Sequence, residues 1–182
     1  MNDAGRVADA GRQGPIRLAR WTVTSGSNVN SRAAVVLAAA GHDWQASAEG
    51  NGAVDALVRA VNVALADVLG GDPKLLEYDV HALAEGPDAE GRVIVRIAPP
   101  PSATGERATG SFAGEMRSTN IVAASVEAYV EALNALLGDA SWTGAAADAG
   151  ARRGPAAGTD HAATTADFGD DAQPDTSAWF NR

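Results

Sequence analysis

The chain has 182 residues, contains no cysteine, and carries 14 basic against 23 acidic side chains, a formal net charge of −9. That charge argues against nucleic acid or an anionic membrane as a partner, since phosphates and lipid headgroups attract basic surfaces. Without cysteine, disulfides, thiolate metal sites and cysteine nucleophiles are excluded, and the composition fits a reducing compartment. No apolar run approaches the roughly 20 residues of a membrane span, and the N-terminus lacks the apolar segment of a signal peptide. We therefore expect a cytoplasmic protein.

The first part of the chain predicts three strands. Residues 16–24 alternate with a noisy period of two and end in turn-forming residues. Residues 32–40 and 43–49 are the next two strands, and the Gly41-His42 pair near their boundary reads as a hairpin turn.

A glycine-rich turn, Gly50-Asn51-Gly52, leads into the first predicted helix. Asn51 can cap the first free N–H groups of this helix, and its flanking glycines allow a close approach or a positive φ. Free N–H groups at a helix start can bind a small anionic group such as an amino-acid carboxylate, although a plain strand-to-helix turn explains the same residues. The helix is expected to stop at Gly70-Gly71. Its apolar positions have the spacing of one helical face: Val54, Leu57, Val58, Val61, Leu65, Val68 and Leu69.

The second part of the chain repeats this order. Strands are predicted over residues 76–85, 91–98 and 106–114, the second of them rich in β-branched side chains. An apolar helix is predicted over residues 121–137, and Gly138 is expected to end it.

The two parts match as copies of one βββα unit. We therefore divide a domain at 16–138 into the units 16–71 and 72–138. The repeat predicts an α+β fold in which helices pack on antiparallel sheet. Two such units can bury their apolar faces against each other or against a second chain, as a homodimer. Sliding the first helix onto the second superposes Val54 on Val122, Ala56 on Ala124, Val58 on Val126, Ala60 on Ala128, Ala64 on Ala132 and Leu65 on Leu133.

Both ends of the chain lack the pattern of a folded domain. Residues 1–15 and 139–182 are rich in Gly, Ala and Asp and have little apolar periodicity, so we expect a disordered leader and a disordered low-complexity tail. Trp179-Phe180 in the tail is either a docking segment or an aromatic pair without a role.

Catalytic and metal-binding patterns are absent from the sequence. His42, His81 and His161 have no ligand spacing, so neither a metal site nor a cofactor is expected. Asp79 and His81 share a strand face, but no nucleophile accompanies them. The turn at 50–52 has neither the lysine of a phosphate loop nor the three glycines of a dinucleotide fingerprint. A small enzyme is therefore the least favoured hypothesis.

Four segments in a fixed order resemble one known family. They are TVTSG at 22–26, EGNGAVDAL at 49–57, LLEYDVHAL at 75–83 and STNIVAASVEAYVEALNALL at 118–137. Together they are similar to the C-terminal regulatory domain of α-isopropylmalate synthase, over about residues 16–138. The resemblance implies two βββα units that dimerise and bind the pathway end product, leucine, at the dimer interface. Related citramalate synthases carry a similar domain that senses isoleucine.

The resemblance also implies a set of effector-binding residues. The glycine turn would place Gly52 and Val54 at the pocket, with Asn51 helping to present backbone donors to the amino-acid carboxylate. Ile121, at the start of the second helix, would close the apolar wall. A dry pocket suits a branched aliphatic side chain, while element ends suit its charged head group. The second unit would supply further lining from Leu75, Tyr78, Ala82 and Ala89.

Two residues depart from the family pattern: Ala53 stands where proline is usual, and Asn120 where an acidic residue is frequent. The synthase's catalytic barrel does not fit a chain of this length. We therefore expect a non-catalytic regulatory domain of leucine biosynthesis, not an enzyme, that binds a branched-chain amino acid as a homodimer. Leucine is the first candidate ligand, and a separate synthase catalytic subunit is a further candidate partner. The alternative is a dimerisation or scaffold domain that has lost effector binding.

Overall fold

The computed structural model describes residues 16–39, 41–86 and 88–153. In chain order its elements are β1 (Ile16–Thr24), β2 (Ser31–Ala39), β3 (His42–Gly50), α1 (Ala53–Ala64), α2 (Ala66–Leu69), β4 (Lys74–Ala82), β5 (Gly91–Ala98), η1 (Gly105–Ala108), β6 (Phe112–Ser118), α3 (Ile121–Leu137), η2 (Ala140–Trp142) and α4 (Ala145–Arg153), where η marks a 3-10 turn.

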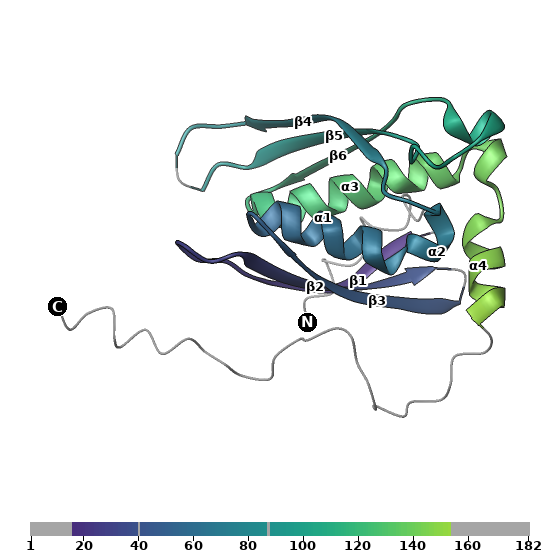
Figure 1. The fold of residues 1–182 in the computed structure, drawn as a ribbon. Helices are drawn as coiled ribbons and strands as arrows, with labels where there is room; N and C mark the ends of the chain where they lie inside the picture. Colours follow the sequence, from purple (N-terminus) through teal and green to yellow (C-terminus); the bar gives the residue numbers. More distant parts are fainter. Residues whose placement is uncertain (1–15, 40, 87, 154–182) are drawn as a thin grey trace, which may run out of the picture.

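Two three-stranded antiparallel sheets enclose the two long helices (Figure 1). One sheet has the order β1-β2-β3 and the other β4-β5-β6, so each sheet is built from one unit of the repeat. Helix α1 packs on β2 and β3, α3 packs on β5 and β6, and the two helices contact each other. The predicted α+β fold of two βββα units is confirmed.

The strand register shows how closely the two units correspond. Both first strands carry an irregularity at the same place, between Leu18 and Arg20 in β1 and between Leu75 and Glu77 in β4. Such a bulge shifts which side chains face the core. Residues with matching partners in the two sheets are therefore Leu18 and Leu75, Trp21 and Tyr78, Val35 and Val95, and Trp44 and Phe112.

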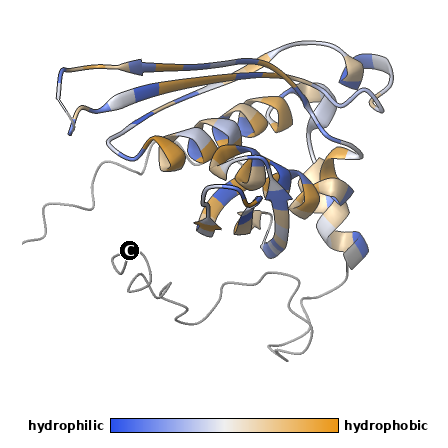
Figure 2. Cartoon of the chain, turned by 60° about the vertical axis from the view of Figure 1, so that its left-hand side comes forward, coloured by the Kyte–Doolittle hydropathy of each residue, from blue (hydrophilic) through white to orange (hydrophobic). Residues whose placement is uncertain are grey.

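The core lies between the inner faces of the sheets and surrounds both helices. Hydrophobic and hydrophilic residues alternate along the strands (Figure 2), as expected for sheets with one buried face. A polar contact crosses this core, because the buried Tyr129 hydroxyl of α3 donates a 2.6 Å hydrogen bond to Asn62 Oδ1 of α1. The largest buried side chains include Val35, Leu37, Trp44, Leu57, Val61, Leu65, Val93, Ile97, Leu133 and Leu136.

Gly114 in β6 sets how closely the second sheet approaches α3. A Cβ atom at this position would overlap the Ala128 carbonyl oxygen and lie 2.6 Å from the Ala132 nitrogen. Because both obstacles are helix backbone, any larger residue would push β6 away from α3.

Several boundaries differ from the sequence prediction. Strand β4 spans Lys74–Ala82 rather than 76–85, and β6 ends at Ser118 rather than at 114. The first helix is interrupted at Leu65, whose φ of −100° and ψ of 12° depart from helical values and separate α1 from α2. The last strand begins at Phe112 rather than at 106, because Gly105–Ala108 forms a 3-10 turn in the connection from β5.

Asn120, one of the two departures from the family pattern, is the N-cap of α3. Its Oδ1 accepts a 3.1 Å hydrogen bond from the Ala123 N–H. A neutral amide therefore supplies the acceptor that an acidic side chain would otherwise offer to this helix start.

The prediction of a disordered tail is wrong for residues 139–153. The η2 turn buries Trp142, and α4 packs beside α2. Gly150 lies against the His42 ring, since a Cβ atom there would be 2.8 Å from His42 Nε2. The alanines and glycines that suggested low complexity are small enough to allow this close packing. The buried face of α4 includes Ala145, Ala146 and Ala149.

The remaining predictions for the chain ends, the leader at 1–15 and the tail at 154–182 with Trp179-Phe180, lie outside the described residues. Within the described ranges no single helix has both the length and the hydropathy to cross a membrane. Helix α3 and the segment Ala140–Arg152 meet those criteria only as a pair bent by 87°.

Candidate functional site

A mainly apolar cavity of about 180 Å³ lies between α1, α3 and the edge strand β4. Three residues of the predicted binding site, Val54, Leu75 and Tyr78, are part of its wall. The cavity therefore brings together side chains from both units of the repeat. Its complete lining is Val54, Asp55, Val58, Leu75, Tyr78, Val95, Ser125 and Tyr129.

The cavity exists because the two first strands pack differently. Strand β1 contacts both helices, and its Leu18 and Trp21 are partly buried against the core. Strand β4 packs mainly on β5, so the matching Leu75 and Tyr78 stay 53% and 42% exposed. Trp21 therefore packs against the core of the first unit. At the matching position of the second unit, the space beside Tyr78 stays open.

The Tyr78 ring is held by a short chain of hydrogen bonds. Its hydroxyl lies 2.7 Å from Ser125 Oγ, and Ser125 Oγ donates to the Ile121 carbonyl oxygen at 2.6 Å. Because the serine proton is committed to Ile121, the tyrosine hydroxyl is the donor to the serine. These hydrogen bonds fix the Tyr78 ring, which belongs to an exposed edge strand, against the start of α3.

Asp55 places a carboxylate at the edge of the cavity. It accepts hydrogen bonds of 2.9 Å from the Arg59 Nε and from the Asn51 backbone N–H. The Arg59 hydrogen bond, followed by that of Asn51, holds the pKa of the Asp55 carboxyl below its ordinary value. The group is therefore ionised at neutral pH, and its remaining lone pairs can accept from a ligand's ammonium group.

Tyr129 lies deep in the wall of the cavity. Burial raises the pKa of its hydroxyl well above the ordinary value. This side chain is therefore neutral at physiological pH, and its polar atom is already paired with α1. The ring face offers a ligand an apolar surface.

The glycine turn is built differently from the prediction. Gly52, not Asn51, is the N-cap of α1, and no side chain caps it. The Asn51 N–H is occupied by the Asp55 carboxylate, so this donor does not face the cavity as a free group. Gly50 is required there, since a Cβ atom would lie 2.5 Å from the Ala56 nitrogen. Gly52 is half-buried and outside the lining, with nothing within 4 Å of a Cβ added to it.

The three remaining predicted residues lie outside the cavity wall. Ala82 ends β4 and pairs with Gly91, and a Cβ atom at Gly91 would overlap Ile121 Cδ1. Ile121 is thus adjacent to this strand end and connects to the cavity through Ser125. Ala89 is half-buried in the turn that follows β4 and donates its N–H to the Gly86 carbonyl at 3.2 Å.

Five lining residues were not predicted as site residues: Asp55, Val58, Val95, Ser125 and Tyr129. The apolar stripe of the first predicted helix included Val58, which packs against the core, and Tyr129 is itself a core residue. The sequence could have indicated Ser125 and Tyr129 as site residues, because a hydroxyl group on an apolar helix face requires a hydrogen-bond partner.

Near the end of β4, His81 Nε2 lies 2.8 Å from Asp79 Oδ2, and both side chains are exposed. No nucleophile is associated with this pair in the described structure. Nor do the described residues contain a group of three or more His, Asp or Glu side chains that could hold a metal ion.

Fold and cavity together define a domain of two βββα units with a small apolar binding cavity beside an exposed edge strand. The chain belongs to the family described as the LeuA allosteric (dimerisation) domain, whose model matches residues 5–137. Residues 138–153, which contain η2 and α4, lie beyond that match.

The chain is also similar to full-length biosynthetic enzymes. It is 37% identical over 122 residues to 2-isopropylmalate synthase from Aquifex aeolicus, covering 66% of this chain and 21% of the relative. It is 38% identical over 122 residues to a putative (R)-citramalate synthase from Methanoculleus marisnigri, covering 67% of this chain and 22% of the relative. The chain thus matches about a fifth of the length of these relatives.

Proposed function

We propose that this chain is a non-catalytic regulatory domain that binds a branched-chain amino acid, leucine first among them, as a homodimer. The observation that carries the proposal is the cavity itself. Val54, Leu75 and Tyr78, selected from the sequence alone, surround one apolar space between α1 and β4. The family description, an allosteric dimerisation domain, supports the same function.

The chemistry of the cavity suits an amino acid with an aliphatic side chain. At about 180 Å³ the space is smaller than the roughly 300–1,000 Å³ of pockets for drug-sized ligands. The side chain would lie against Val58, Val95 and the Tyr129 ring, where burial removes apolar surface from water. The ammonium group would pair with the Asp55 carboxylate at the edge.

The exposed face of β4 is the surface that we assign to the dimer. An edge strand with this much exposed apolar surface is a ready site for a second chain. A second copy that covers this face would also close the open side of the cavity, because Leu75 and Tyr78 belong to both surfaces. The exposed apolar residues on or directly after β4 are Leu75, Leu76, Tyr78, Val80 and Leu83.

Ligand and dimer are then coupled by mass action. A ligand that contacts both protomers stabilises the dimer that binds it, and the dimer in turn raises the affinity for ligand. A separate synthase catalytic subunit, of the kind named in the relatives, would respond to the dimer arrangement that the ligand favours. We place this role in cytoplasmic leucine biosynthesis.

Isothermal titration calorimetry with leucine, isoleucine and valine tests the proposal. Leu75→Trp fills the mouth of the cavity from an exposed position and should abolish binding without disturbing the core. Val63→Trp, on the exposed face of α1, is the matched control and should bind as the wild type does. Heat from none of the three ligands on a folded dimer would overturn the proposal in favour of a scaffold that has lost effector binding.

A further inference from the structure

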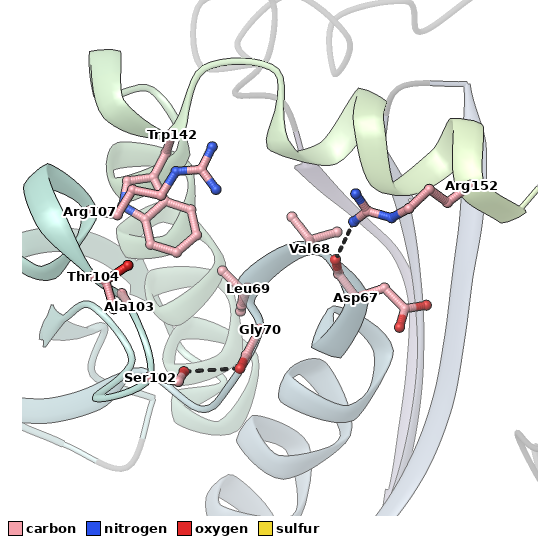
Figure 3. A pocket seen from close by; sticks show the side chains of 10 residues that line it. All are labelled: Asp67, Val68, Leu69, Gly70, Ser102, Ala103, Thr104, Arg107, Trp142 and Arg152. Carbon is pink, nitrogen blue, oxygen red and sulfur yellow. Dashed lines mark hydrogen bonds between the residues drawn. The ribbon is translucent and has the colours of Figure 1, made fainter.

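A second recess, of about 300 Å³, is lined by residues of α2, the connection after β5, η2 and α4 (Figure 3). We call it the α2–α4 cleft. The apolar cavity adjoins the first turns of α1, whereas this cleft adjoins α2, which follows the end of α1. It is lined by Asp67, Val68, Leu69, Gly70, Ser102, Ala103, Thr104, Arg107, Trp142 and Arg152.

Two arginines are held in place in the wall of the α2–α4 cleft. The Arg107 guanidinium lies over the Trp142 ring, 5.0 Å from its centre, and Nε donates to the Ser141 carbonyl at 2.6 Å. Arg152 Nη2 donates to the Asp67 carbonyl at 3.1 Å. A guanidinium has five N–H donors, so each keeps further donors for a ligand after these tethers are made. Pre-positioned guanidinium groups lose little side-chain entropy on binding a carboxylate.

The indole of Trp142, on which Arg107 lies, carries a buried N–H group. Trp142 is only 2% exposed, and its Nε1 has no hydrogen-bond partner among the described residues. Burying an N–H group without a partner is unfavourable, and such groups are rare in folded proteins. This N–H group is not exposed to the cleft, so it serves as a buried probe beside Arg107.

The charge of the cleft contrasts with that of the whole chain. The chain carries a net charge of −9, yet two guanidinium groups line the cleft and Asp67 has the only carboxylate among its described lining residues. Figure 3 shows the Asp67 carboxylate pointing away from Arg107 and Trp142, and the two arginines on either side of Val68. A positive recess on an acidic surface favours a small anion.

We propose that the α2–α4 cleft binds a small organic dicarboxylate. One carboxylate pairs with the Arg107 guanidinium and the other with that of Arg152, and the carbon chain between them lies on Val68 and Leu69. This site is independent of the amino-acid cavity. Two of its residues, Trp142 and Arg152, come from the segment beyond the family match, so it is a property of this chain rather than of the matched domain.

The test is a titration of the ¹⁵N-labelled full chain with succinate, followed by NMR at constant ionic strength. The indole N–H peak of Trp142, assigned by its loss in Trp142→Phe, should shift in a saturable manner. Acetate and inorganic phosphate are the comparison anions, and each should bind at least about tenfold more weakly, because neither engages both guanidinium groups through a carbon chain. Equal binding of all three anions would contradict the assignment to a dicarboxylate.

Arg107→Gln and Arg152→Gln should each weaken succinate binding at least about tenfold. Arg96→Gln is the matched control, because Arg96 pairs with Glu77 on the outer face of the second sheet. Two variants separate anion binding from the packing of η2. Arg107→Lys keeps the positive charge, and Arg152→Gln leaves Arg107 stacked on Trp142. A loss of η2 packing in Arg107→Gln alone therefore does not decide the result. No succinate-dependent shift in the wild type, or an unchanged shift in both glutamine variants, would show that the arginines serve only to hold η2 and α4.

Discussion

Removing the buried hydrogen bond between Tyr129 and Asn62 should lower the free energy of unfolding. The two residues are 2% and 8% exposed, and the oxygen atoms are 2.6 Å apart. Tyr129→Phe deletes the donor and leaves Asn62 Oδ1 buried without it. A neutral hydrogen bond contributes about 1 kcal/mol, and an unsatisfied buried acceptor adds a penalty of about 1–3 kcal/mol. We expect the free energy of unfolding to fall by about 2 kcal/mol.

Urea denaturation at a fixed protein concentration measures this loss. The midpoint should fall while the slope with denaturant stays the same, since the surface exposed on unfolding hardly changes. The double variant Tyr129→Phe, Asn62→Leu is the control: with both polar partners removed, it should recover part of the lost stability. A loss below about 0.5 kcal/mol in the single variant, with no coupling in the double, would refute this account of the core.

The same hydroxyl makes stability depend on alkaline pH. Burial raises the pKa of Tyr129 in the folded state, whereas the unfolded chain titrates near 10.0. Above that pH the unfolded state binds fewer protons than the folded one, so stability falls as pH rises, by about 1.4 kcal/mol per unit. Tyr129→Phe lacks this effect. The stability gap between wild type and variant should therefore shrink by about 1.4 kcal/mol between pH 7 and pH 11, and a constant gap would contradict the buried, un-ionised hydroxyl.

Three further variants test other parts of the structure. Gly114→Ala should destabilise the fold by several kcal/mol, on the order of the largest single-site effects, because its Cβ would overlap the backbone of α3; Gly52→Ala, with open space around it, is its control in thermal unfolding. Val80→Asp, on the exposed face of β4, should convert the dimer to a folded monomer in sedimentation velocity, and an unchanged dimer would place the interface elsewhere. Ala149→Arg, at a fully buried position of α4, should detach that helix and increase protease cleavage after residue 143, while uniform protection would show that α4 is not held by this face.

The sequence predicted the elements of the two units because each carried a complete local signal. Helix α3 ran from Ile121 to Leu137 as expected, since its apolar stripe was unbroken and Gly138 ended it. Helix α4 was missed because its packing depends on small residues fitting closely against α2 and His42. Alanine and glycine carry little periodic signal, and the same composition is typical of disordered segments.

The candidate site was predicted in part, and the reason lies in tertiary packing. Val54, Leu75 and Tyr78 line the cavity, whereas Gly52 and Ala89 lie outside its wall. Strands β1 and β4 have the same register and the same bulge, but they pack differently on the helices. This difference in packing decides whether a side chain lines the cavity or fills the corresponding space. No local pattern distinguishes Trp21 in a filled position from Tyr78 beside an open one.

The most direct test of the central claim is an NMR measurement of contacts between bound leucine and the cavity. With ¹³C-labelled leucine and unlabelled protein, the leucine methyl protons should show nuclear Overhauser effects to the ring protons of Tyr78 and Tyr129, the two aromatic side chains of the lining. The Leu75→Trp variant should show none of these contacts. Saturable leucine binding with contacts to other aromatic side chains, and none to either tyrosine, would contradict the assignment of the effector site to this cavity.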